Sequence, residues 1–418
     1  MDQIIIHGGR RLKGDVRISG AKNAALPILA STILGGGECV LSNMPSVVDV
    51  LTMGKLLRML GIAVVQEGEH TVAHAQTIAS TEAPYDLVRT MRASVLVLGP
   101  LVARMGEAKV SLPGGCAIGS RPVNFHLAGL EKMGASVEIE HGYIKATARR
   151  LRGGRIYFDI PSVTGTENLM MAAVLAEGTT VLENAAKEPE ITDLADFLVK
   201  RGARIAGAGT DMITIEGVTE LHGADHDVIP DRIEAGTYLV AGAITGGEVS
   251  VERCRPEHLE PLLVKLRESG AELAEEAGRV RLKMNGRLKG TNVRTSPHPG
   301  FPTDMQAQFV ALMAVAEGTS VVTETIFESR FMHVEELRRM GSDIRVEGNR
   351  VVITGKERLT GAPVMASDLR ASAGLIVAGL AAEGTTEVSR VYHLDRGYER
   401  LEAKLNALGA RVERRKGK

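Results

Sequence analysis

The sequence is poor in cysteine and aromatic residues and has no tryptophan, which narrows the classes of protein it can encode. Its three cysteines, Cys39, Cys116 and Cys254, are an odd number without C-x-x-C spacing, so neither a disulfide framework nor a structural zinc site fits. Only 3% of residues are aromatic, which weakens any function that stacks nucleic-acid bases on aromatic side chains. A reducing, cytoplasmic location fits this cysteine content best.

An excess of one charge and long apolar runs are also missing. The 50 Lys and Arg residues balance 51 Asp and Glu, so no global field favours nucleic acid or a membrane surface, and any anion site must be local. No segment approaches the roughly 18 uninterrupted apolar residues of a membrane span. The N-terminal sequence MDQIIIHGGRRLKGDV predicts a strand and a turn, and its apolar run is too short for a signal peptide. We therefore expect a globular chain of two domains, with no membrane, nucleic-acid or protein partner implied.

An internal repeat organises the whole chain. A helix end, a glycine and a short strand recur in GGGECVLSN, RMGEAKVSL, AEGTTVLEN, TGGEVSVER, AEGTSVVTE and AEGTTEVSR. The first marker glycines lie 66 to 72 residues apart, at Gly37, Gly106, Gly178, Gly247, Gly318 and Gly384. A second set predicts a helix closed by glycine before a strand, at Gly61, Gly134, Gly202, Gly270, Gly341 and Gly409.

Each repeat is predicted to contain two helices of different character. The helix before the first marker glycine is apolar nearly all round, as in LMMAAVLAEG and FVALMAVAEG, so it should be buried on every side. The helix before the second marker glycine, as in YERLEAKLNALG, is amphipathic and more exposed. Buried helices surrounded by strands predict an α/β fold of barrel-like domains with helices inside. Three repeats per domain follow from domain size alone.

Positions where the repeats depart from the shared apolar pattern are candidate functional residues. Fourteen residues before each first marker glycine, at the head of the apolar helix, stand Asn23, Arg92, Thr164, Ile233, Asp304 and Arg370. Helix capping or first-turn decoration is one interpretation for Asn23 and Asp304. Arg92 and Arg370 do not fit it, because a cation near a helix N-terminus opposes the helix dipole, and a bound anion explains them better.

The loop between the first strand and the second helix gives another comparison. Eleven to 13 residues before the second marker glycine stand Asp49, Arg121, Glu190, His258, Arg330 and Arg396. The three arginines lie at predicted strand ends near helix starts, where the backbone favours anions. Each of them alone could be a solvated surface arginine. Together with Lys22 they indicate a cationic site.

Cys116 lies in the second repeat's version of this loop, which is lengthened by GGCAIG. Its neighbouring glycines offer little apolar side chain to bury it, and Arg121 nearby should lower its pKa and make it reactive. The alternative is a flexible loop with an incidental cysteine. Cys39 and Cys254 lie in or at the ends of predicted strands and are expected to be structural.

Several cations, one carboxylate and one thiol suit a small, multiply anionic substrate. Asp304 would act as a base or orient a hydroxyl, and Cys116 would act as an acid or a nucleophile. The sequence has neither a G-x-x-x-x-G-K-[ST] loop nor a G-x-G-x-x-G fingerprint in a strand–turn–helix context, and its His and carboxylate spacing offers no metal site. The residues alone therefore indicate an anion-binding enzyme with a reactive cysteine and without a cofactor or metal.

Seven ordered motifs across essentially the whole chain resemble the UDP-N-acetylglucosamine 1-carboxyvinyltransferases, the enolpyruvyl transferases that open bacterial peptidoglycan synthesis. The motifs are GAKNAALPILA, PGGCAIGSRPV, PDRIEAGTYLVAGAI, FPTDMQAQF, ESRFMHVEEL, DLRASAGLIVAGLAAEGTT and HLDRGYERLEAKL. The resemblance implies two inside-out α/β barrel domains of three repeats each, with substrates bound between them. One domain would span residues 20–229 and carry Cys116 on a lid, and the other would combine residues 1–19 with 230–418.

The resemblance also implies the reaction. The sugar 3-hydroxyl would attack C2 of phosphoenolpyruvate while C3 is protonated, and the tetrahedral intermediate would then expel phosphate. Cys116 matches the family's general acid, which also forms a phospholactoyl adduct and is alkylated by fosfomycin. Asp304 would be the base near the sugar hydroxyl, and Lys22 and Arg396 would also take part in catalysis.

The resemblance assigns the remaining site residues to substrate binding. Lys22, Arg121 and Arg396 would hold phosphoenolpyruvate, and Asn23, Arg92, Arg330 and Arg370 would support or line the cleft. The nucleotide sugar would contact Arg121, Pro122, Val123, Asn124, Phe125, Ser162, Val163, Thr164, Asp304 and Ile326. Asn124 stands where many members carry Asp, and Thr164 where Gly is common. These departures bear on the uridine and diphosphate contacts.

Two alternative functions stay open. A sister transferase acts on shikimate 3-phosphate and shares the fold and an arginine-rich cleft, but its family lacks the cysteine loop. A catalytically silent paralogue that binds a UDP-sugar would be expected to lack Cys116, Asp304 or Arg396, and all three are present.

Overall fold

The computed structural model describes residues 2–89, 91–112, 123–327 and 329–417, which fold into two compact units. The N-terminal unit contains residues 20–112 and 123–229, apart from residue 90. The C-terminal unit contains residues 2–19 and 230–417, apart from residue 328. No helix in the described ranges combines the length and the apolar character needed to span a bilayer.

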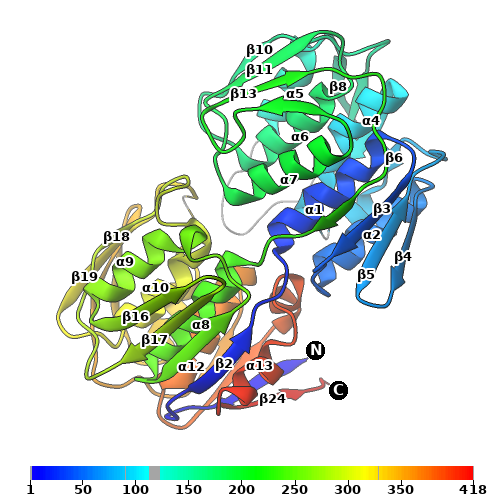
Figure 1. The fold of residues 1–418 in the computed structure, drawn as a ribbon. Helices are drawn as coiled ribbons and strands as arrows, with labels where there is room; N and C mark the ends of the chain where they lie inside the picture. The colour runs from blue at the N-terminus through cyan, green and yellow to red at the C-terminus, as the bar shows by residue number, and fades with distance from the viewer. Residues whose placement is uncertain (1, 90, 113–122, 328, 418) are drawn as a thin grey trace. The chain divides into compact units, whose positions relative to one another are not determined.

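Three four-stranded sheets form the outside of the N-terminal unit (Figure 1). In each, the first strand below pairs parallel with the second, and the other pairs are antiparallel. In hydrogen-bonded order the sheets are β14 (Asp225–Asp227), β3 (Glu38–Ser42), β5 (His70–His74) and β4 (Ala63–Glu67); β6 (Glu82–Ala83), β7 (Glu107–Ser111), β9 (Tyr143–Thr147) and β8 (Ser136–Glu140); and β10 (Arg155–Tyr157), β11 (Thr179–Glu183), β13 (Met212–Glu216) and β12 (Arg204–Ala206).

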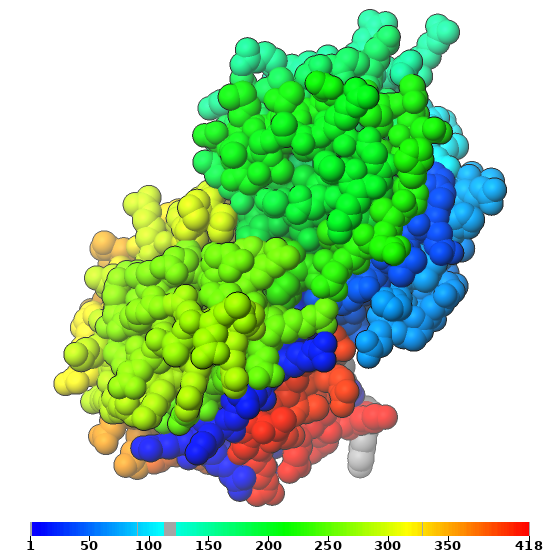
Figure 2. All heavy atoms as spheres, in the orientation of Figure 1, coloured from blue at the N-terminus to red at the C-terminus, as the bar shows by residue number. Residues whose placement is uncertain are grey.

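The C-terminal unit repeats this pattern in three more sheets. They are β2 (Lys13–Arg17), β15 (Glu248–Glu252), β17 (Arg279–Met284) and β16 (Ala271–Glu276); β18 (Val293–Arg294), β19 (Thr319–Thr323), β21 (Arg350–Thr354) and β20 (Asp343–Glu347); and β22 (Pro363–Met365), β23 (Thr385–Ser389), β1 (Gln3–His7) and β24 (Arg411–Arg415). The two ends of the chain meet in the last sheet, where β1 pairs antiparallel with both β23 and β24. Figure 2 shows the N-terminal strands in blue beside the red C-terminal residues.

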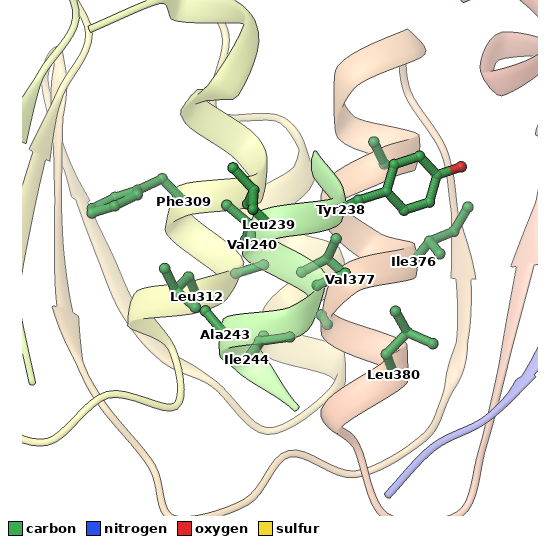
Figure 3. Packing of buried hydrophobic residues seen from close by; sticks show 14 of the residues in the cluster. Tyr238, Leu239, Val240, Ala243, Ile244, Phe309, Leu312, Ile376, Val377 and Leu380 are labelled. Carbon is green, nitrogen blue, oxygen red and sulfur yellow. The ribbon is translucent and has the colours of Figure 1, made fainter. Parts of the chain in front are cut away.

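Six helices are buried inside the two units, as their all-round apolar sequences predicted. They are α1 (Lys22–Ser31), α4 (Leu98–Met105) and α6 (Val163–Ala173) in the N-terminal unit, and α8 (Arg232–Ile244), α10 (Gln306–Met313) and α12 (Leu369–Ala381) in the C-terminal unit. In the C-terminal unit the three helices pack against one another, with Leu239, Leu312 and Val377 among the core side chains (Figure 3).

The second helix of each repeat is amphipathic and lies partly exposed, also as predicted. These helices are α2 (Val48–Met59), α5 (Asn124–Lys132), α7 (Pro189–Lys200), α9 (Glu260–Glu268), α11 (His333–Arg339) and α13 (Leu401–Ala407). Short helical turns complete the repeats: α3 (Tyr85–Val88), η1 (Thr32–Leu34), η2 (Arg92–Val97), η3 (Pro256–His258), η4 (Thr303–Met305) and η5 (Val391–Arg396).

The second set of marker glycines ends helices as predicted. All six of the second set have a positive φ, between 87° and 103°, a left-handed conformation that other residues rarely adopt. Five of the first set also have a positive φ; in the fourth repeat the preceding Gly246 takes that conformation instead of Gly247.

The apolar helix of the second repeat differs from the expectation of one continuous α-helix. Its first six residues form the 3₁₀ helix η2, and α4 begins only at Leu98. Pro100 has no N–H to bond back to an earlier carbonyl, and the N–H of Gly99 donates to Asn168 Oδ1 at 2.8 Å. Both features interrupt α-helical hydrogen bonding at the junction.

Close approach of α10 and α12 determines where the starts of these two helices lie. A Cβ atom added to Gly374 would come within 2.9 Å of the backbone carbonyl of Ala307, so only glycine fits without movement. Gly374 is one turn into α12 after Arg370, and Ala307 follows Asp304 by three residues. This contact brings the two polar helix starts together.

Candidate active site

The first repeat position falls at the start of the buried helix in every repeat. Asn23, Thr164, Ile233 and Arg370 are the second residues of α1, α6, α8 and α12. Arg92 opens η2, and Asp304 is the second residue of η4, which leads into α10. Sequence comparison of the repeats therefore identified structurally equivalent positions.

Asp304, Arg330 and Arg370 form one charged cluster in the C-terminal unit. Asp304 Oδ1 accepts a hydrogen bond from Arg330 Nη2 at 2.9 Å. Asp304 Oδ2 accepts two hydrogen bonds from the Arg370 guanidinium group, from Nε at 3.1 Å and from Nη2 at 2.9 Å. The two arginine side chains are 4% and 3% exposed, and that of Asp304 is 24% exposed. The carboxylate is therefore the accessible member of the cluster.

The charges in this cluster stabilise one another. Burial alone would lower the pKa of Arg370, but the Asp304 carboxylate, Tyr398 and Asp231 together outweigh it, and the pKa lies above its usual value. Two adjacent guanidinium groups in turn favour the ionised form of Asp304. The sequence attributed Arg370 to a bound anion; in the structure, its anionic partner is Asp304 of the same chain.

Arg396 ends η5, and the residues around it are tied to the rest of the C-terminal unit. Its neighbour Asp395 accepts hydrogen bonds from Arg414 of β24 at 2.6 and 3.0 Å. Tyr398, two residues further on, places its ring 5.5 Å from the guanidinium carbon of Arg370. The Tyr398 hydroxyl also hydrogen-bonds Thr237 Oγ1 of α8 at 2.9 Å. The segment that carries Arg396 is thus anchored on both sides.

Lys22 and Asp49 form the corresponding charged pair of the N-terminal unit. Lys22 Nζ, at the start of α1, lies 3.2 Å from Asp49 Oδ2, at the start of α2. The Lys22 side chain is 13% exposed and that of Asp49 is 2% exposed. This pair lies within one repeat, whereas the pair of Asp304 and Arg370 joins two repeats.

A buried histidine stands beside the other polar helix starts of the N-terminal unit. His126 Nε2 lies 3.3 Å from Thr164 Oγ1. Burial, together with the smaller effect of the Arg92 charge, lowers the pKa of His126 to about 4. The imidazole is therefore neutral at physiological pH. Ser162 caps α6, since its hydroxyl oxygen accepts from the N–H of Gly165 at 3.2 Å.

Carboxyl groups are buried near the start of α7 in the same unit. Glu167 of α6 is 2% exposed, and burial together with the charges of Glu190 and Glu188 raises its pKa well above the usual value. Its surroundings therefore favour the protonated form of Glu167. Glu190 occupies the second repeat position at the start of α7, as Asp49 does at the start of α2.

Several predicted site residues lie apart from these clusters or outside the described residues. Cys116, Arg121 and Pro122 are outside the described residues. Val123 precedes α5, Asn124 opens it with an exposed side chain, and Phe125 makes an edge-to-face contact with Phe158 at 6.1 Å. Ile326 is partly buried after β19, and Val163 opens α6. Cys39 and Cys254 are buried free thiols, as expected of structural cysteines.

From the sequence we did not identify Thr303, which hydrogen-bonds Arg330 of the charged cluster, or Glu324, which hydrogen-bonds Thr303. Arg330 Nη1 donates to Thr303 Oγ1 at 2.8 Å, and Thr303 Oγ1 donates to Glu324 Oε2 at 2.8 Å. Glu324 lies six residues after the marker Gly318. The same offset gives Asn43, Leu112, Asn184, Arg253 and Arg390 in the other repeats, so a further repeat comparison would have shown that this position is mostly polar and included Glu324.

Among the described residues no group of three or more His, Cys, Asp or Glu side chains could hold a metal ion.

Comparison with solved structures identifies the class of protein. The fold matches the enolpyruvyl transferase NikO from Streptomyces tendae with a TM-score of 0.89 and 26% identity, covering 99% of this chain and 98% of that chain. It also matches EPSP synthase from Acinetobacter baumannii with a TM-score of 0.77 at 20% identity over 100% of both chains, which shows the fold alone. The sequence profile of EPSP synthase (3-phosphoshikimate 1-carboxyvinyltransferase) matches residues 6–405. The predicted fold class, that of the enolpyruvyl transferases, is confirmed.

Sequence relatives narrow this class. A UDP-N-acetylglucosamine 1-carboxyvinyltransferase of Myxococcus xanthus is 58% identical over 100% of both chains. A protein of the same name from Nitratidesulfovibrio vulgaris is 59% identical over 99% of both chains. The chain belongs to the UDP-N-acetylglucosamine 1-carboxyvinyltransferase family of enolpyruvyl transferases. The resemblance drawn from the seven motifs is confirmed.

Proposed function

We propose that this chain transfers the enolpyruvyl group of phosphoenolpyruvate to the 3-hydroxyl of UDP-N-acetylglucosamine and releases phosphate, the first committed step of peptidoglycan synthesis. The observation that carries the proposal is identity of 57–59% over essentially the full length with relatives of that name. The cluster of Asp304, Arg330 and Arg370 supports it, because it presents one accessible carboxylate to a hydroxyl substrate.

In the proposed reaction, the sugar O3–H adds across the double bond of phosphoenolpyruvate. The O3–C2 bond forms, Asp304 takes the hydroxyl proton, and Cys116 gives a proton to C3. In the second step C3 gives a proton back to the Cys116 thiolate, the double bond re-forms, and the C2–O bond to phosphate breaks as the leaving phosphate takes up the proton held by Asp304. The two arginines favour the ionised form of Asp304, so it orients the hydroxyl and receives the proton only as the O3–C2 bond forms.

The remaining proposed roles follow the charges of the two substrates. Lys22, Arg121 and Arg396 would bind the phosphate and carboxylate of phosphoenolpyruvate. Arg330 and Arg370, which are buried against Asp304, would position the carboxylate and not contact the phosphate themselves. Asn23 and Arg92 would line the cleft.

The nucleotide sugar would be bound by residues on several helix starts and loops. We propose contacts from Arg121, Pro122, Val123, Asn124, Phe125, Ser162, Val163, Thr164, Asp304 and Ile326. The helix start at Ser162 offers backbone N–H groups of the kind that bind diphosphates. A cytoplasmic location is proposed with this function, since the free thiols Cys39 and Cys254 fit a reducing compartment.

Phosphate release by the purified chain tests the proposal. The chain is mixed with phosphoenolpyruvate and UDP-N-acetylglucosamine, and in parallel with phosphoenolpyruvate and shikimate 3-phosphate, the substrate implied by the name of the matching profile. Release with the nucleotide sugar alone is expected. Release with the shikimate ester alone would transfer the function to the sister activity, and no release with either would favour a non-catalytic UDP-sugar binder.

The role of Cys116 is tested by Cys116→Ser with Cys254→Ser as the matched control. Turnover by Cys116→Ser should be abolished or severely slowed while the protein stays folded. Cys254→Ser changes a buried free thiol elsewhere and should remain active and sensitive to thiol alkylation. Unchanged turnover by Cys116→Ser would overturn its assignment as the general acid.

A further inference from the structure

Glu324 is a buried carboxylate whose surroundings consist of hydrogen-bond donors. Its side chain is part of a residue only 2% exposed, directly after β19. Oε1 accepts from Thr295 Oγ1 at 2.7 Å and from the N–H groups of Ile326 and Phe327 at 2.7 and 3.2 Å. Oε2 accepts from Thr303 Oγ1 at 2.8 Å. A buried charge is tolerated at this place because four donors converge on it.

The repeats show that Glu324 departs from the common structure of this position. Its equivalents Asn43 and Asn184 have φ values of 56° and 53°. Their side-chain amides donate to the carbonyls of Val228 and Phe158, which directly follow the parallel edge strands, at 2.7 Å in both cases. Glu324 makes the corresponding link through Thr295, which directly follows β18.

In addition, Glu324 hydrogen-bonds Thr303, at the head of the inner helix of its own repeat. The side chains of the two equivalent asparagines bond to the end of the edge strand instead. A carboxylate with two acceptor oxygens can serve both links at once, whereas an amide offers one acceptor oxygen. The departure therefore adds a connection from the sheet to the residue beside Asp304.

Glu324 and Asp304 are linked by a chain of hydrogen bonds through Thr303 and Arg330. The donor and the acceptor of each bond in this chain are fixed. A guanidinium group has no acceptor, so Arg330 Nη1 must donate to Thr303 Oγ1. The single hydroxyl proton of Thr303 is then directed to the Glu324 carboxylate. The other end of the same guanidinium donates to Asp304 Oδ1. Arg330 is thus held between two carboxylates, one of them through a hydroxyl.

We propose that Glu324, acting through Thr303, is a positioning residue that fixes the guanidinium plane of Arg330 and thereby the orientation of the Asp304 carboxylate. The inference rests on the proposed function, because it deepens the role assigned to Asp304. Phe327, whose ring lies 5.2 Å from the Arg330 guanidinium carbon, covers a face of the same group. Arg370 holds the second oxygen of Asp304, so the two sides together determine its orientation.

Two threonine variants separate this positioning role from a purely structural one. Thr303→Val and Thr295→Val each remove one hydroxyl that donates to Glu324, at 2.8 and 2.7 Å, with nearly unchanged shape. Only Thr303 also accepts from Arg330. Thr303→Ser keeps the hydroxyl and serves as the conservative variant.

Steady-state phosphate release with phosphoenolpyruvate and UDP-N-acetylglucosamine is measured for all three variants, together with urea unfolding. We expect Thr303→Val to lower kcat by about tenfold with little change in KM for phosphoenolpyruvate. Thr295→Val should lose a similar amount of stability and keep kcat within about threefold, and Thr303→Ser should keep kcat within the same range. An unchanged kcat in Thr303→Val, or an equal loss in Thr295→Val, would overturn the proposal.

A second measurement decides the inference even if the proposed function fails. With ¹⁵N-labelled arginine, the guanidinium signals of Arg330 are assigned by their loss in Arg330→Lys, and their hydrogen exchange is followed by NMR. Exchange should be slow in the wild type and in Thr295→Val and faster in Thr303→Val. Absence of phosphate release by the wild type would reject the proposed function alone, whereas equal exchange in both threonine variants would reject the positioning role of Glu324.

Discussion

The two units share one architecture but treat the charged residues at their helix starts differently. In the C-terminal unit, Asp304 binds Arg370 of the next repeat and Arg330 of its own, and both arginines are buried by these contacts. In the N-terminal unit, Lys22 pairs with Asp49 of its own repeat. The helix starts therefore carry a carboxylate held by cations in one unit and a cation held by a carboxylate in the other.

Because of this difference, the cationic residues Arg330 and Arg370 are expected to act differently from the cationic residue Lys22. Arg330 and Arg370 have their anion within the protein, so their main effect is on the carboxylate. Lys22 is the more exposed member of its pair, at 13% against 2% for Asp49, so its ammonium group is the one that can meet an anionic ligand. A positive charge at a helix start is therefore not by itself a sign of substrate binding.

Asp304→Asn breaks the C-terminal cluster and should have the largest effect. The amide cannot take the proton of the sugar hydroxyl, and general-base catalysis contributes about 10²- to 10⁴-fold, so kcat should fall by that order. Two buried arginines also lose their counter-ion, which should lower the free energy of unfolding by about 3 kcal/mol. Phosphate release and urea unfolding measure the two effects. Wild-type kcat in this variant would remove Asp304 from the proposed mechanism.

The Lys22–Asp49 pair can be tested by combining two substitutions. Lys22→Gln should lower kcat/KM for phosphoenolpyruvate by about 10²-fold if the ammonium group binds substrate, since a charged hydrogen bond and the Coulombic attraction are both lost. The double variant Lys22→Gln, Asp49→Asn restores charge balance. Activity as low as that of Lys22→Gln confirms substrate binding. Recovery of activity in the double variant would mean that Lys22 only neutralises Asp49.

Gly374→Ala tests whether close helix packing sets the Asp304–Arg370 geometry. The new Cβ would lie 2.9 Å from the backbone of Ala307, so α12 and α10 must separate, at a cost of about 1–3 kcal/mol in stability. We expect kcat to fall by about tenfold as the Asp304–Arg370 contact lengthens. Gly379→Ala is the control on the same helix, because its Cβ would meet side chains of Ile6 and Thr386 at 3.0 Å or more. Equal loss of kcat in both variants would show a general effect on α12.

The glycine periodicity explains how much of the fold could be predicted from the sequence. Helix ends require a left-handed residue, and this requirement appears directly as glycine at Gly61, Gly134 and their equivalents. The all-round apolar helices were equally visible, because burial on every side leaves no polar face. The 3₁₀ start at Arg92 was missed, since it depends on a hydrogen bond from Gly99 to the distant Asn168.

The candidate site was predicted residue by residue but not as an arrangement. Repeat comparison located Asp304, Arg330 and Arg370 at helix starts, because a polar residue in an apolar helix is conspicuous. Their mutual contact depends on how closely two helices approach, which is set by Gly374 and Ala307 and has no periodic signal in the sequence.

Substitution of two buried histidines, one in each unit, should have the smallest effect at neutral pH, because their contribution to stability changes only in acid. Burial lowers the pKa of His126 to about 4, helped by Arg92. Burial also lowers the pKa of His333 to about 4, where Asp368 acts in the opposite direction and Arg330 in the same one. In the unfolded chain both titrate near 6.5. The unfolded state therefore binds more protons between pH 4 and 6.5, and stability should fall as the pH drops through this window.

His126→Gln and His333→Gln should each make the free energy of unfolding depend less steeply on pH, by up to about 1.4 kcal/mol per pH unit. Both imidazoles are neutral at neutral pH, so the loss of their titration should not change activity there. Urea unfolding at several pH values measures the slope. Glu234 acts oppositely in the C-terminal unit, because burial raises its pKa to about 6, so only the difference between wild type and variant isolates each histidine. Equal flattening would show that both units respond to acid alike despite their different charge arrangements. Flattening by one variant alone would assign the acid sensitivity to that unit, and flattening by neither would mean that these imidazoles are charged in the folded protein.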